Sequence, residues 1–242
     1  MNAIVTGASQ GIGRAIVEKF AQSSINVWAC ASRENEQLEE YAKELEAQYG
    51  VWIKPVYFDL RDEDQAKKQL GQIVNEKKPI DILVNNAEPS LGGLMQMTSL
   101  KKLRKVMEIN FISQIGVMQT VSEVMIRQRY GSIVAIAFAE GPEAEKENLA
   151  YGSSKAAFVL ASRMMSKELG PYHIRVNVVA PRLVGTDMEI NKSQEARQKI
   201  WDEDSKKRLG TSKGIADIVY FLATEESCFM TGSVVNVDGG QL

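Results

Sequence analysis

The sequence predicts a single α/β domain with a doubly wound parallel sheet, and three observations predict it. Short runs of apolar and β-branched residues recur along the chain, separated by amphipathic stretches of helical length. A glycine-rich turn joins the first apolar run to the first helical stretch. No Pro-, Gly- or Ser-rich linker and no internal repeat divides the 242 residues, so we expect one domain over residues 1–242.

The apolar runs are predicted strands because they are short and rich in Val and Ile, and the stretches between them have the length and pattern of helices. Strict alternation of the two is typical of a parallel sheet of about seven strands with helices on both faces. In chain order the strands are AIVT near residue 3, NVWACA from 26, WIKPVYF from 52, DILVNN from 81, SIVAIAF from 132, IRVNVVAP from 174 and VVNVD from 234. The helices are expected at 12–23, 34–49, 62–77, 99–129, 152–169 and 213–223.

Composition excludes several classes of function. The net charge is −2 and no basic stripe stands out, so no nucleic-acid partner is expected. Cys30, Cys228 and the single histidine, His173, are far apart, which indicates neither a metal site nor a disulfide framework and favours the cytoplasm. No segment has the pattern of a signal peptide or the length of a membrane span, so no membrane association is expected.

Three glycines shape the turn after the first strand, where Gly7, Gly11 and Gly13 follow a GxxxGxG spacing. Glycines at this position let the backbone approach a pyrophosphate, whose charge is stabilised by free amides at the start of the next helix. Glycine-rich turns also occur in proteins that bind no nucleotide, so the motif alone is weak evidence.

Tyr151 and Lys155 are four residues apart at the start of a predicted helix, so both side chains project from one face. A neighbouring ammonium favours the phenolate form of a tyrosine, which makes the phenol a better acid or base near neutral pH. A helix-surface pair with no catalytic role is the alternative for this spacing.

These motifs occur together in one order: TGASQGIG from Thr6, NNA from Asn85, MEINF around Asn110, and the pair of Tyr151 and Lys155. With them the chain resembles the short-chain dehydrogenase/reductase family over nearly its whole length, and most resembles its 3-oxoacyl-[acyl-carrier-protein] reductases. The resemblance implies a Rossmann-type fold and reduction of a small-molecule ketone to an alcohol with a nicotinamide cofactor. It also implies a homo-oligomer, a dimer or tetramer, formed through the long helices.

The resemblance implies roles for individual residues. Tyr151 would act as acid/base, Lys155 would tune it and hold the nicotinamide ribose, and Asn110 would relay protons through water; an asparagine that only breaks a helix turn is the alternative for Asn110. The implied cofactor-binding residues are Gly7, Ser9, Gly11, Ile12, Gly13, Ser32, Arg33, Asp59, Leu60, Asn86, Ala87, Tyr151, Lys155, Pro181, Val184 and Thr186.

The end of the second strand favours NADP(H) over NAD(H). Arg33 can pair with a 2′-phosphate and Ser32 can donate to it, with Arg14 one turn into the first helix. Against this, Gln10 stands where NADP-using relatives often carry a basic residue, and Arg33 is also explained as a solvated surface charge.

One residue of the family pattern is missing, because no serine or threonine occurs from Ile133 to Ala150 and Phe138 aligns with the catalytic serine. Ser132 lies at the opposite end of the strand and cannot replace it. Loss of such a donor typically lowers the rate about a hundred- to a thousandfold. Two hypotheses therefore remain: an NADPH-dependent reductase, or a nucleotide-binding homologue with little or no catalysis.

Other departures surround the same pocket. Glu88 and Arg182 replace glycines of the family pattern, and Arg182 could pair with Glu88 or with a substrate anion. Residues 140–147 carry four glutamates against one lysine, an acidic rim that would repel an acidic carrier protein, although Arg127 and Arg129 could attract one. The polar segment 182–210 follows a strand's carboxyl end and is a candidate lid; a pair of surface helices is the alternative.

Overall fold

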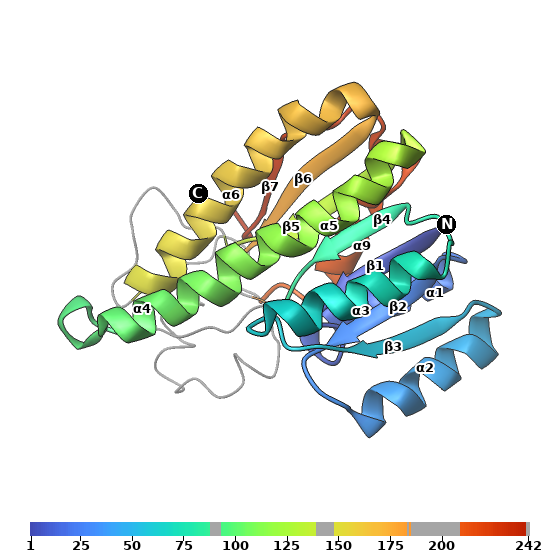
Figure 1. The fold of residues 1–242 in the computed structure, drawn as a ribbon, viewed down its shortest axis with the longest axis horizontal. Helices are drawn as coiled ribbons and strands as arrows, with labels where there is room; N and C mark the ends of the chain where they lie inside the picture. The colour runs from blue at the N-terminus through green and yellow to red at the C-terminus, as the bar shows by residue number, and fades with distance from the viewer. Residues whose placement is uncertain (88–92, 139–147, 183, 185–208, 241–242) are drawn as a thin grey trace.

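The computed structural model describes residues 1–87, 93–138, 148–182, 184 and 209–240 (Figure 1). The strands are β1 (Asn2–Thr6), β2 (Asn26–Ala31), β3 (Ile53–Tyr57), β4 (Ile82–Asn85), β5 (Gly131–Ile136), β6 (Ile174–Pro181) and β7 (Val234–Val237). The α-helices are α1 (Gly11–Gln22), α2 (Glu36–Tyr49), α3 (Glu63–Asn75), α4 (Leu100–Met107), α5 (Ser113–Gln128), α6 (Leu149–Leu169) and α9 (Ser212–Ala223). A π-helical segment, η2 (Glu108–Ile112), joins α4 to α5, and the short 3-10 turns are η1 (Met95–Met97), η3 (Gly170–Tyr172) and η4 (Glu225–Ser227).

All seven strands lie in one parallel sheet in the order β3-β2-β1-β4-β5-β6-β7. The chain moves outward from β1 to β3 and then returns to the other side of β1 at β4. The connections after β1 and β4 consequently leave the sheet in opposite directions, and ligands bind at such a switch point in open α/β sheets. The predicted doubly wound sheet is confirmed.

Two layers of helices cover the two faces of the sheet, and successive side chains along β1 pack alternately against one layer and the other. Ala3 and Val5 pack in the layer formed with α1, α2 and α9, whereas Ile4 packs in the opposite layer with α3, α5 and α6. Strands buried on both faces need apolar residues throughout, which explains why the strand runs are continuously apolar. In Figure 1, α3 and α5 cross in front of the sheet.

The helix predicted at 99–129 differs from the prediction, because η2 interrupts it between α4 and α5. Ser99 caps the start of α4, where its side chain accepts from the Lys102 amide at 3.2 Å. A π-helical turn holds one extra residue and rotates the following turn, a change that helical periodicity in a sequence does not reveal. Within the described part of the chain, no helix has both the length and the apolar character that crossing a membrane requires.

Candidate active site

The glycine turn after β1 has the backbone geometry that the motif requires. Gly7 and Gly11 adopt positive φ angles of 68° and 54°, a region that favours glycine. A Cβ atom built on Gly13 would lie 2.1 Å from the Gly7 carbonyl oxygen, so only glycine fits there. The side chain of Gln10 does not cap the start of α1. A glycine turn followed by backbone amides at a helix start fits a diphosphate.

Thr6, which the sequence analysis did not single out, links this turn to the end of β4. Its Oγ1 accepts hydrogen bonds from the amides of Asn86 at 2.9 Å and Ala87 at 3.1 Å. The Asn86 side chain returns the contact by donating to the carbonyls of Thr6 at 3.0 Å and Gly7 at 3.3 Å. The two loops at the switch point are therefore held together, and the only signal for Thr6 is a hydroxyl at the end of an otherwise apolar strand.

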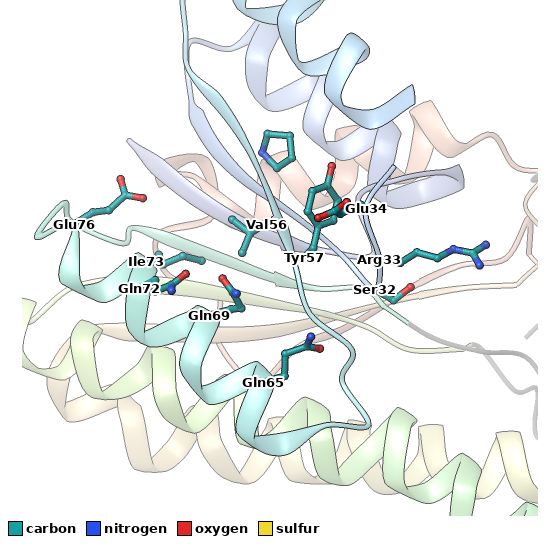
Figure 2. A pocket seen from close by; sticks show the side chains of 11 residues that line it. Ser32, Arg33, Glu34, Val56, Tyr57, Gln65, Gln69, Gln72, Ile73 and Glu76 are labelled. Atoms are coloured by element: carbon teal, nitrogen blue, oxygen red, sulfur yellow. The ribbon is translucent and has the colours of Figure 1, made fainter. Parts of the chain in front are cut away.

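Ser32 and Arg33 are exposed at the end of β2 and line one end of a cavity of about 610 Å³ (Figure 2). The cavity continues between β3 and α3 as far as Glu76. Glu34 also lines it, so an acidic side chain adjoins the two predicted phosphate-binding residues. Most of its lining is polar, which suits a polar ligand group at the Arg33 end.

The Arg14 guanidinium stacks over the Tyr41 ring of α2, with Cζ 3.8 Å from the ring centroid. This contact holds Arg14 and does not leave it as a second unengaged cation next to Arg33. The Tyr41 hydroxyl donates to Glu18 at 2.9 Å. Burial and the neighbouring Glu18 carboxylate raise the pKa of Tyr41 to about 12. The contact fixes the direction of the Arg14 side chain.

Asp59 and Leu60 follow β3, where the resemblance implies contact with the adenosine. Arg61 donates through Nε to both carboxylate oxygens of Asp59 at 2.9 Å, and this contact lowers the pKa of Asp59. The Asp59 amide donates to Gln65 at 2.6 Å, and Leu60 is buried. The loop therefore presents a charged pair on the surface and an apolar residue inside.

Tyr151 and Lys155 lie in the first two turns of α6, on one face as predicted. Their side chains are 5% and 3% exposed, and Lys155 Nζ lies 5.8 Å from the Tyr151 ring centroid. Nζ also donates to the Ile136 carbonyl at the end of β5, at 3.0 Å. The ammonium is therefore fixed between the sheet and the tyrosine ring.

Asn110 lies in η2 and is fully buried beside α6. Its Nδ2 donates to Ser154 Oγ at 3.3 Å, and Ser154 Oγ donates in turn to the Tyr151 carbonyl at 2.7 Å. Ser154, a second residue absent from the sequence prediction, is the middle of this connection. The structure thus brings together the three residues predicted to be catalytic.

Phe138 follows β5 and faces Tyr151, with ring centroids 5.4 Å apart and planes inclined by 68°. Ser132 is buried at the other end of β5, where its hydroxyl donates to the Leu222 carbonyl at 3.0 Å. Phe138, which the sequence analysis aligns with the family's serine, therefore presents a phenyl ring to Tyr151.

Pro181 ends β6, and Val184 is buried and forms an isolated bridge with Gly210. Ser9 and Ile12 lie in and just after the glycine turn. Thr186, Glu88, the acidic segment and nearly all of the candidate lid lie outside the described residues. The predicted pairing of Glu88 with Arg182 also lies outside the described residues, because Glu88 does.

Comparison with known proteins decides the family. Residues 7–241 match the model of a family described as enoyl-(acyl carrier protein) reductase. The chain is 34% identical over 237 residues to a 3-oxoacyl-[acyl-carrier-protein] reductase of Aquifex aeolicus, covering 98% of this chain and 95% of that protein. The corresponding Escherichia coli protein is 32% identical over 238 residues, covering 98% and 96%. The chain belongs to the short-chain dehydrogenase/reductase family.

Solved structures of this family agree with the fold. A structure described as YwfH, an NADPH-dependent reductase involved in bacilysin biosynthesis, superposes with a TM-score of 0.92 at 25% identity, covering 100% of this chain and 98% of that one. A short-chain dehydrogenase/reductase from Mycobacterium ulcerans gives 0.93 at 26% identity, covering 99% and 89%. Family membership assigns the chain to the NAD(P)-dependent oxidoreductases.

Proposed function

We propose that this short-chain dehydrogenase/reductase uses NADPH to reduce the ketone of a 3-oxoacyl thioester, or a similar small carbonyl compound, to the alcohol. The observation that carries the proposal is a buried group of three residues: Lys155 Nζ lies 5.8 Å from the Tyr151 ring centroid, and Asn110 is joined through Ser154 to the Tyr151 main-chain carbonyl. A chain that only bound a nucleotide would not need this arrangement. The names of its relatives supply the substrate class.

The glycine turn fits a dinucleotide, because the positive φ angles of Gly7 and Gly11 and the close packing of Gly13 on Gly7 bring bare backbone to the start of α1, where a diphosphate can approach the amides. When bound, a reduced nicotinamide supplies a hydride to the carbonyl carbon. Tyr151 then gives its phenolic proton to the carbonyl oxygen, so that a C–H and an O–H bond replace the C=O π bond. The Lys155 ammonium stabilises the phenolate that remains, and Asn110 takes part in its reprotonation.

The choice of NADPH rests on the charge at the end of β2. Arg33 is exposed at the cavity and makes no ion pair with another described residue, so its guanidinium is available to a 2′-phosphate beside the Ser32 hydroxyl. Glu34 opposes an anion in the same cavity. A phosphate bound bidentately by Arg33 is closer to the positive charge than to the negative one, so NADPH remains favoured.

Phe138 supports a second candidate function, a cofactor-binding homologue with little catalysis. A phenyl ring cannot donate a hydrogen bond to a developing oxyanion, which removes a large stabilising interaction. For the reductase, a water, a backbone amide or a group of the substrate must polarise the carbonyl instead. Turnover of NADPH with a 3-oxoacyl thioester, measured beside a Tyr151→Phe variant, separates the two functions.

A homo-oligomer, dimer or tetramer, is part of the proposal. Large apolar side chains are exposed on α5 and α6 or beside them: Ile112 is 53%, Leu160 55% and Met164 56% exposed. Leu160 and Met164 are four residues apart on α6 and so share one face, and exposed apolar residues of this kind favour association. Light scattering on the wild type and on Leu160→Glu tests this, and a monomeric wild type would refute it.

A further inference from the structure

Gln114 is a buried glutamine in the first turn of α5 that belongs to no motif of the sequence. Its side chain is 2% exposed, and Nε2 donates to the carbonyls of Ala87 at 2.5 Å and Ile109 at 3.3 Å. Its own main-chain carbonyl accepts from Asn85 Nδ2 at 3.0 Å. One residue therefore contacts both the end of β4 and the π-helical segment.

The contact at Ala87 bears on the nucleotide turn. Ala87 is held from the β1 side by Thr6, which accepts from its amide, and from the α5 side by Gln114, which donates to its carbonyl. A Cβ on Gly7 would lie 2.9 Å from Ala87 Cα, so the two backbones are already in close approach. A shift of Ala87 would therefore change the shape of the phosphate turn.

The contact at Ile109 bears on the other half of the site. Ile109 precedes Asn110, which donates to Ser154, and Ser154 donates to the Tyr151 carbonyl. A continuous series of hydrogen bonds and short backbone segments thus runs from Ala87 through Gln114 to Tyr151. Gln114 is the member that joins the cofactor side to the catalytic side.

A purely packing role would not need an amide at this position. Gln114 Oε1 is buried and makes no hydrogen bond within the described part of the chain. A buried acceptor without a partner is destabilising, whereas an apolar side chain of the same shape would avoid that cost. The benefit must therefore come from Nε2 and the carbonyls that it holds.

We propose that Gln114 is a positioning residue that sets the place of Ala87, and with it the bound nicotinamide cofactor, relative to Tyr151. The inference rests on the proposed function. Gln114→Met keeps the length of the side chain and removes the donor, so the Ala87 carbonyl loses its partner. Gln119 lies on the same helix but is exposed, which makes Gln119→Met the matched control.

The first experiment measures the dissociation constant for NADPH and the kcat and KM for a 3-oxoacyl thioester. For Gln114→Met we expect binding of NADPH to weaken about three- to tenfold, the effect of losing the hydrogen bond that holds Ala87. We also expect kcat to fall with little change in the KM for the ketone, and Gln119→Met to match the wild type. Unchanged binding and kcat in Gln114→Met would overturn the inference.

Gln114→Glu gives a second measurement, the pH dependence of NADPH affinity, which a purely structural role of Gln114 would not change. Burial raises the pKa of the introduced carboxyl, and its neutral form can donate to Ala87 while its anion would face two carbonyl oxygens. Affinity for NADPH should therefore be kept at low pH and lost as pH rises between about pH 5 and pH 8. The elements packed against α5 carry other titratable groups, all present in the wild type as well: Glu108 on η2, Tyr151, Lys155, Arg163, Lys167 and Glu168 on α6, and Glu63, Asp64, Lys67 and Lys68 on α3.

The outcomes separate the two proposals. If the wild type binds NADPH and Gln114→Glu shows no pH step beyond that of the wild type, the positioning role is wrong while the proposed function stands. If the wild type binds neither NADPH nor NADH, the proposed function fails, and the inference fails with it. If Gln114→Met does not fold, the comparison of pH dependence between Gln114→Glu and the wild type decides whether Gln114 positions the cofactor.

Discussion

Phe138 and Tyr151 pack edge to face, with ring centroids 5.4 Å apart. An aromatic pair of this geometry contributes about 0.5–1.5 kcal/mol beyond the burial of its area. The contact restricts the Tyr151 ring from the side where relatives of this chain are expected to have a serine. On the proposed alignment Phe138 takes the place of a donor, and its ring contact at the same time orders the residue proposed to deliver the proton.

Tyr151→Phe should lower kcat for ketone reduction by about a hundred- to ten-thousandfold, because the phenolic proton is lost while the ring remains. Cofactor affinity should change little. Steady-state kinetics and a fluorescence titration with NADPH check the two parts. Tyr172→Phe, outside the site, is the control, and equal activity of the two variants would remove Tyr151 from the mechanism.

Gly13→Ala should abolish measurable binding of the cofactor, because the new methyl group would lie 2.1 Å from the Gly7 carbonyl oxygen. Gly71→Ala is its matched control: Gly71 lies within α3, and nothing is within 4 Å of the added Cβ. We expect the control to stabilise the fold by about 0.5–1 kcal/mol in denaturant unfolding, with unchanged binding. Normal NADPH affinity in Gly13→Ala would contradict the assigned turn.

Much of this site could be predicted because strand ends and glycine turns carry strong local signals. The carboxyl ends of β1, β4, β5 and β6 meet at one edge, so motifs far apart in sequence come together there. Gln114 and Ser154 gave no such signal. Their roles depend on the π-helical segment and on contacts among α5, α6 and the loop after β4, and neither appears in residue spacing.

The direction of the Arg14 side chain could not be predicted from residue spacing either. Helical spacing places it near the start of α1, as predicted, but its guanidinium stacks on Tyr41, a residue of α2. Only the packing of α1 against α2 determines that direction, because a long side chain has many rotamers in isolation.

Arg33→Ala should weaken NADPH binding about ten- to a hundredfold, the effect of losing a charge-assisted hydrogen bond, and leave NADH binding nearly unchanged. Isothermal titration with each cofactor measures the ratio. Arg127→Ala, an exposed change at the far end of α5, should leave both affinities as they are. An equal loss for NADH and NADPH would mean that Arg33 does not recognise the 2′-phosphate.

Arg61→Ala should return the pKa of Asp59 toward its ordinary value, because Arg61 lowers it in the folded chain. A carboxyl with a depressed folded pKa adds stability above its unfolded pKa of about 3.9, and this stability is lost as pH falls through the folded value. Arg61 is exposed, so solvent screens the pair and its effect on stability at neutral pH should be small. An NMR titration of Asp59 that gives the same pKa in both proteins would refute the pairing.

The reductase proposal depends most directly on the rate at which the wild-type chain oxidises NADPH with a 3-oxoacyl thioester, measured beside Phe138→Ser after both are shown to bind the cofactor. We predict that the wild type turns over and that Phe138→Ser changes kcat by less than about tenfold, because a different donor polarises the carbonyl and the serine loses the packing on Tyr151. An inactive wild type beside an active Phe138→Ser would contradict the proposal and favour a cofactor-binding homologue without catalysis.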